Sequence, residues 1–137
     1  MTSRATLEAL LARVLEGTGP DRKLNADIAV TLGGWERKWH DSERPHGWYW
    51  RRGDYSWTAE GEGYPADYLG SLDAALTLVP EGWSWHVALR TYLTFFRATG
   101  SVWQEGQQRA TFTADAATPA RALIAACLKA RMEAQGE

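Results

Sequence analysis

The stretch WSWHVAL, residues 83–89, decides the fold, because large apolar residues alternate along it without a break. The apolar positions are Trp83, Trp85, Val87 and Leu89, and the residues that separate them are small or polar. In an extended chain such alternation places the apolar side chains on one face. The stretch therefore predicts a strand with one face on a core and the other toward solvent.

Two further strands are predicted after this one, at Tyr92–Ala98 and Gln108–Thr113, with turns near Gly100 and Gly106. Short strands at this spacing are typical of an antiparallel meander.

Helices are predicted before and after this block of strands. The clearest has an apolar face around Leu123, Ile124 and Leu128 and starts after Thr118, a suitable N-cap. The predicted helices cover residues 4–16, 20–32, 71–79 and 119–133. This order indicates an α+β fold in which an antiparallel sheet is sandwiched between helices.

Residues 35–66 form a Trp-rich insertion within one domain that spans residues 1–137. Five of the eight tryptophans lie between Trp35 and Trp57. Residues 47–52 and 54–58 are predicted to form a β-hairpin, with Gly53 and Asp54 at the turn.

Composition restricts the function classes. The chain has 137 residues, a size typical of one domain, and its formal net charge of −2 gives no overall attraction to nucleic acid. Its one cysteine, Cys127, is predicted in the core, which fits a reducing compartment. Neither a signal peptide nor a membrane-spanning run is visible, so we expect a cytoplasmic protein without a membrane partner.

Three segments carry a resemblance to a known family. They are GPDRKLNADIA at residues 19–29, YLGSLDAALTLVPEGW at residues 68–83 and ATPARAL at residues 117–123. Together they resemble the phage ABA sandwich domain, found in small phage and prophage proteins. The resemblance covers roughly residues 5–32 and 68–132 and implies a sheet between two helical layers. It brings no functional residues with it, and residues 35–58 depart from the family pattern.

The candidate site lies in the departing segment, where tryptophans alternate with arginines. Trp, Tyr and Arg are the residues enriched in protein–protein hot spots. The candidate partner- or ligand-binding residues are Trp48, Trp50, Arg51, Arg52, Trp57 and Arg44. The same indoles could instead fill a core beneath the segment, so the sequence leaves both placements open.

The leading hypothesis is a non-enzymatic phage or prophage protein without cofactor or metal. It would bind a bacterial host protein, as an antagonist of a host defence system, in the cytoplasm of the host cell. An uncovered Trp-rich hairpin would also favour a homodimer.

Two alternatives remain from other function classes. In the first, the protein binds and sequesters a nucleotide signal, with an indole stacked on the base and arginines on the phosphates. In the second, it is a small hydrolase that uses His86 or the loop from His40 to His46. That loop matches no standard zinc spacing, and His86 has no partner at a motif spacing, so neither a metal site nor a catalytic residue is assigned.

Overall fold

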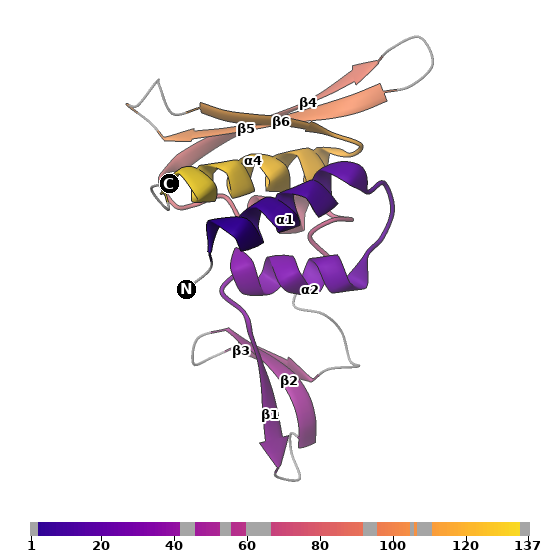
Figure 1. The fold of residues 1–137 in the computed structure, drawn as a ribbon, viewed down its shortest axis with the longest axis vertical. Coiled ribbons are helices and arrows are strands. Elements are labelled where there is room, and N and C mark those ends of the chain that lie inside the picture. The colour runs from indigo at the N-terminus through magenta and orange to yellow at the C-terminus, as the bar shows by residue number, and fades with distance from the viewer. Residues whose placement is uncertain are drawn as a thin grey trace.

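The structure is a computed structural model that describes residues 3–41, 46–52, 56–59, 67–91, 96–104, 106 and 111–134 (Figure 1). Its elements are α1 (Arg4–Glu16), α2 (Arg22–Thr31), β1 (Glu36–Asp41), β2 (His46–Arg52), β3 (Ser56–Ala59), α3 (Leu72–Leu76), β4 (Trp83–Thr91), β5 (Phe96–Gln104), β6 (Thr111–Ala116) and α4 (Pro119–Ala134). The strands form two antiparallel sheets, β1-β2-β3 and β4-β5-β6. The α+β class is confirmed.

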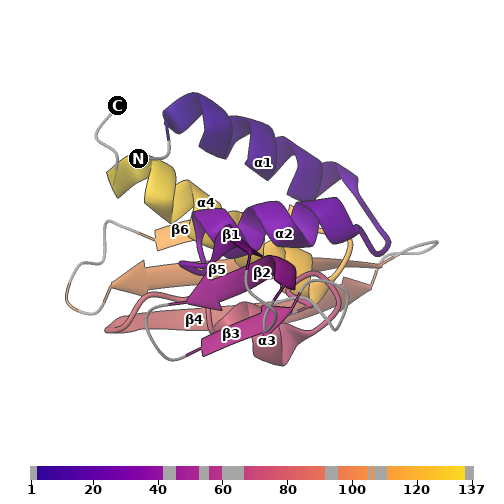
Figure 2. The same ribbon diagram turned by 90° about the horizontal axis from the view of Figure 1, so that it is seen from below.

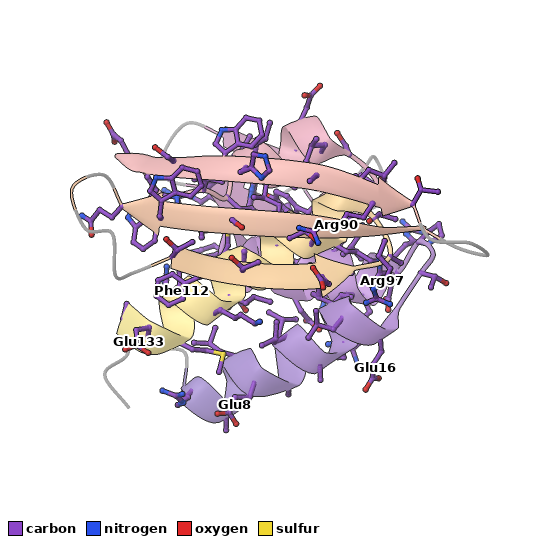
Figure 3. All side chains as sticks on the ribbon, turned by 90° about the horizontal axis from the view of Figure 1, so that it is seen from above. Glu8, Glu16, Arg90, Arg97, Phe112 and Glu133 are labelled. Atoms are coloured by element: carbon purple, nitrogen blue, oxygen red, sulfur yellow. The ribbon has the colours of Figure 1, made fainter. Side chains whose placement is uncertain are left out.

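The layers are ordered differently from the expected sandwich. In the described part of the chain the helices pack on one face of β4-β5-β6, and its other face carries no helix (Figures 1 and 3). The sheet β1-β2-β3 lies beyond α2, at the opposite end of the long axis (Figure 1). Helices therefore lie between two sheets, rather than a sheet between two layers of helices.

The open face of β4-β5-β6 needs no cover because its residues pair with one another across the strands. The hydroxyls of Ser101 and Thr113 lie 2.9 Å apart, and the Thr99 hydroxyl donates to a carboxylate oxygen of Asp115 at 2.7 Å. Such cross-strand pairs stabilise a sheet whose face meets water.

The strand at residues 83–89 is confirmed as β4, but its neighbours lie further along the chain than expected. Gly100, predicted in a turn, stands in the middle of β5 and pairs with Val87 and Ala114. A Cβ atom there would lie 2.6 Å from backbone atoms of Ala122 and Leu123 in α4. The missing side chain thus brings α4 onto the sheet, and Gly100 is a packing residue instead of a turn residue.

Helix α4 forms the centre of the core, with ten of its sixteen residues buried. A helix that is apolar on most sides is stable only when other elements surround it. One side of α4 packs on β5 and β6, and another packs on α1, where Leu7, Leu10 and Val14 are buried.

Side-chain caps start all four helices of the described residues. Ser3, Asp21 and Ser71 each accept a hydrogen bond from the backbone N–H three residues on, and the Thr118 hydroxyl accepts from Arg121 N. Because Asp21 is the N-cap, α2 begins at Arg22, two residues after the expected Pro20. No helix in the described ranges is long and apolar enough to cross a membrane.

Arg121 is a charged residue inside this core, with 2% of its surface exposed. Its guanidinium donates to the carbonyl oxygens of Val14 at 3.1 Å and of Gly19 at 2.5 Å. Carbonyls at the end of a helix have no partner within the helix, so a buried cation there satisfies them and favours the helix dipole. Burial lowers the pKa of Arg121, and the Asp21 carboxylate opposes that effect.

We expect Gly100→Ala to destabilise the protein, because the added methyl group would collide with the α4 backbone. Overpacking of this kind costs about 1–3 kcal/mol. Chemical denaturation would measure the change. Gly19→Ala is the matched control, since a Cβ at Gly19 meets no atom within 4 Å. Equal stabilities of the two variants would show that α4 does not lie as close to β5 as described.

We expect Arg121→Met to lower the free energy of unfolding, because it leaves the carbonyls of Val14 and Gly19 buried without donors. Each such unsatisfied group costs about 1–3 kcal/mol. Arg131→Met, an exposed position on the same helix, should change stability little. Thermal and urea unfolding of both variants would test the difference. An Arg121→Met variant as stable as the wild type would contradict the role of Arg121 as the donor to these two carbonyl groups.

Candidate functional site

The Trp-rich segment folds into the sheet β1-β2-β3. Gly34, whose φ of 75° suits glycine, precedes Trp35 and β1. Strand β1 was not predicted, although Trp35, Arg37 and Trp39 alternate with charged residues in a strand-like pattern. It pairs with β2 from Glu36 to Asp41 and completes a three-stranded sheet around the expected hairpin.

Register divides five of the six candidate residues between two faces of this sheet. Trp48, Trp50 and Arg52 occupy alternate positions of β2, and therefore one face. Arg51 pairs with Trp57, so these two positions belong to the opposite face. Only for Trp50, Arg51 and Arg52 does the structure describe side chains, and Arg44 lies outside the described residues. The candidates thus do not form one continuous surface.

Trp50 is in the interior, with 4% of its surface exposed. The expectation that Trp50 belongs to an exposed partner-binding surface is therefore wrong, and the alternative of a packed indole is correct for this residue. Its indole Nε1 is buried without a hydrogen-bond partner. An unpaired buried donor is unfavourable, so the packing of the ring has to offset it.

A second aromatic group joins the small sheet to the helices. Tyr68 is 2% exposed, and its hydroxyl would lie 2.8 Å from a Cβ at Gly33, where the Trp35 ring is also close. Burial raises the pKa of Tyr68, while the Trp35 side chain and the positive charge of Arg52 act in the opposite direction. The Trp35 Nε1 is nevertheless buried without a hydrogen-bond partner, so the contact between Trp35 and Tyr68 is not a well-formed hydrogen bond. Sequence reasoning missed this junction, since Tyr68 lies far from Trp35 along the chain.

A buried amide fixes the turn that carries Tyr68. Asn25 of α2 accepts a hydrogen bond from Leu69 N at 2.9 Å and donates to Asp67 at 3.0 Å. Asp67 in turn accepts from Gly70 N at 3.1 Å. The aromatic junction therefore rests on α2 through a short hydrogen-bonded network.

The accessible part of the site differs from the expected one. Trp39 is 53% exposed, and the neighbouring Arg37 and the Arg52 side chain are also exposed. Arg37 pairs with Trp50 and Trp39 pairs with Trp48, so these positions share the face of Arg52. The three strands carry four basic and two acidic residues, whereas the whole chain has a net charge of −2. By register these charges are divided between the two faces, and the face of Trp39 has Arg37, Arg52 and Asp41, a net charge of +1 beside an exposed indole.

Other reactive side chains lie elsewhere among the residues that the structure describes. His86 is exposed on the open face of β4, opposite Ser101, whose hydroxyl instead pairs with Thr113. Burial raises the pKa of the Cys127 thiol to about 12, which keeps it protonated, and its predicted place in the core is confirmed. Within the described residues no group of His, Cys, Asp or Glu could hold a metal ion. The side chains from His40 to His46 lie outside the described residues.

The described surface includes several hollows. One of about 530 Å³ runs between α1 and α2 and is bordered by the Arg13–Asp27 ion pair at 2.6 Å. A second of about 380 Å³ lies at the starts of α3 and α4. The third, about 230 Å³, is mainly apolar and includes Trp83 and Cys127. The first two contain hydroxyl groups and a carboxylate, but Asp27 is held by Arg13, and Asp67 accepts hydrogen bonds from Asn25 and from Gly70 N.

No family model matches the chain, and no curated protein or solved structure shows significant similarity to it.

We expect Trp50→Ala to destabilise the protein by about 3–5 kcal/mol, the usual cost of removing a large buried aromatic ring. Trp39→Ala should cost about 1 kcal/mol or less, because most of that ring is exposed. Urea unfolding of the two variants provides the comparison. If the two variants lost similar free energies of unfolding, Trp39 and Trp50 would have to be buried to a similar extent.

Proposed function

We propose that this protein is a non-enzymatic binding protein that docks an acidic partner protein on the β1-β2 face bearing Arg37, Trp39 and Arg52. The observation that carries the proposal is the exposed Trp39 indole beside exposed guanidinium groups, on a sheet that projects from the helical body (Figure 1). Exposed Trp and Arg side chains supply most of the binding energy in many protein interfaces.

Charge supports the choice of an acidic partner. The strands of the small sheet have two more basic than acidic residues, so the remainder of the chain is more negative than the whole. Complementary charge steers association and discriminates against partners of the wrong sign. An acidic protein surface would meet this face favourably and be repelled by the rest of the molecule.

The class of partner follows from the resemblance to the phage ABA sandwich domain. A small accessory phage protein without its own reaction acts by occupying a protein of its bacterial host. We therefore propose a host protein as the partner, with antagonism of a host defence system as the outcome. This step rests on the resemblance and not on the geometry of the face.

A nucleotide signal is the second candidate ligand, favoured by the same exposed indole beside Arg37. Indole rings stack on bases, and guanidinium groups bind phosphate with a fixed geometry. The two candidates differ in the area that they need. A nucleotide would cover Trp39 and one or two arginines, whereas a protein would cover all the exposed residues of the face around the buried Trp50.

We expect Trp39→Ala and Arg52→Glu each to abolish capture of the partner from bacterial lysate. Trp39→Ala removes the anchor, and Arg52→Glu reverses a charge at the rim. Val30→Ala is the matched control, because Val30 is also a large exposed hydrophobic residue but lies on α2. Circular dichroism would establish that all three variants remain folded.

Mass spectrometry of the captured material separates the outcomes. Binding to one acidic protein that weakens with added salt and is lost in both variants supports the proposal. A nucleotide that co-purifies and raises the melting temperature would assign the face to the second candidate. Equal capture by wild type, Trp39→Ala and Arg52→Glu would exclude this face as the binding site.

A further inference from the structure

The four sheet edges of the described structure differ in how well they are protected. Exposed edge strands present unpaired backbone groups, and proteins protect them with charged residues, short strands or a covering element. Strand β1 carries Glu36, Arg37 and Lys38, and β3 has four residues. The edge of β6 is covered at Thr113, whose carbonyl oxygen accepts a hydrogen bond from Lys129 of α4 at 2.8 Å.

Strand β4 lacks these protective features. It has nine residues and pairs on one side only, with β5. Its sequence contains no lysine, proline or glycine, and its one formally charged residue, Arg90, is next to its end. A nine-residue strand extends for about 30 Å, which is long for an unprotected edge.

The same strand carries two of the large hydrophobic residues that remain exposed, Trp85 at 46% and Leu89 at 58%. Val87 lies between them and pairs with Gly100, which faces α4, so all three belong to the helix-facing side of the sheet. Helix α4 packs mainly over β5 and β6. The helix-facing side of β4 is therefore left partly uncovered beside an open edge.

We propose that a second copy of this chain covers the edge, with the two β4 strands pairing antiparallel about a two-fold axis at Val87. This register places Trp85 of one copy opposite Leu89 of the other, and the reverse. The exposed indole and the exposed leucine are thus complementary in a symmetric pair, as a two-fold interface requires. Directly opposed aromatic and aliphatic residues stabilise adjacent strands.

The pairing also satisfies the backbone. It joins two three-stranded sheets into one of six strands, within the common range for sheets. On the open face it sets His86 of one copy opposite Ala88 of the other, and Ser84 opposite Arg90, so no like charges meet at these positions. The short, charged or covered edges of β1, β3 and β6 offer no comparable self-complementary row.

Sedimentation velocity over a concentration series tests the proposal. We expect a species of twice the 15.3 kDa chain mass in the wild type. Leu89→Lys should shift the protein to the monomer mass at the same concentration, because it removes the apolar side chain opposite Trp85 and would bury an ammonium group between the two strands. Val30→Lys is the matched control, since Val30 is similarly exposed but lies on α2. Circular dichroism should show that both lysine variants keep the secondary structure of the wild type.

Disulfide crosslinking tests the register in a Cys127→Ala background. A mixture of His86→Cys and Ala88→Cys chains should form mixed disulfides under mild oxidation, because opposed strand positions have Cα separations within the range that a disulfide spans. Neither variant alone should crosslink efficiently. A monomeric wild type, a dimer that survives Leu89→Lys, or a dimer lost on substitution of Trp39 would each overturn the proposal.

Discussion

The Arg121 guanidinium donates to the carbonyl of Val14 at the end of α1 and to the carbonyl of Gly19 in the following turn. Because Arg121 is on α4, this contact fixes the start of α2 relative to α4 as well as the end of α1. On its other side α4 touches the backbone of β5 at Gly100. One helix therefore positions the helical layer and the sheet together, and the rest of the fold depends on its burial.

The small sheet depends on the core in a different way. It is joined through Trp35 and Tyr68, and Tyr68 is fixed by the Asn25 network at Asp67 and Leu69. Two indole nitrogens buried without partners, on Trp35 and Trp50, are unfavourable in this region. The small sheet thus contains unfavourable groups, whereas the core beside it is well packed. We interpret this difference as a division of roles, in which the core stabilises the fold and the small sheet carries the proposed binding face.

Sequence reasoning succeeded where the local pattern and the tertiary environment agree. The strand at residues 83–89, the cap at Thr118 and the apolar face of α4 all have local signals, and each is confirmed. The predicted burial of one face of that strand is confirmed only in part, because Trp85 and Leu89 are exposed. Gly100 was misplaced because a glycine in a strand and a glycine in a turn look alike until α4 is placed over it. Within the Trp-rich segment, the burial of Trp50 and the exposure of Trp39 could not be predicted, because the two tryptophans look alike in sequence until the strands are paired and packed on the helices.

The two proposed surfaces lie at opposite ends of the molecule, because β4-β5-β6 and β1-β2-β3 flank the helices along the long axis (Figure 1). Seen from below, β1-β2-β3 lies on the near side of the helices (Figure 2). Pairing through β4 would therefore leave the Trp39 face of each copy accessible. A two-fold dimer would then present two equivalent binding faces. Where a partner is itself oligomeric, the second contact forms at a high effective concentration, and weak individual contacts give tight overall binding. A modest face with one exposed indole and a few arginines is sufficient under this arrangement, so the edge of β4 would contribute to affinity without touching the partner.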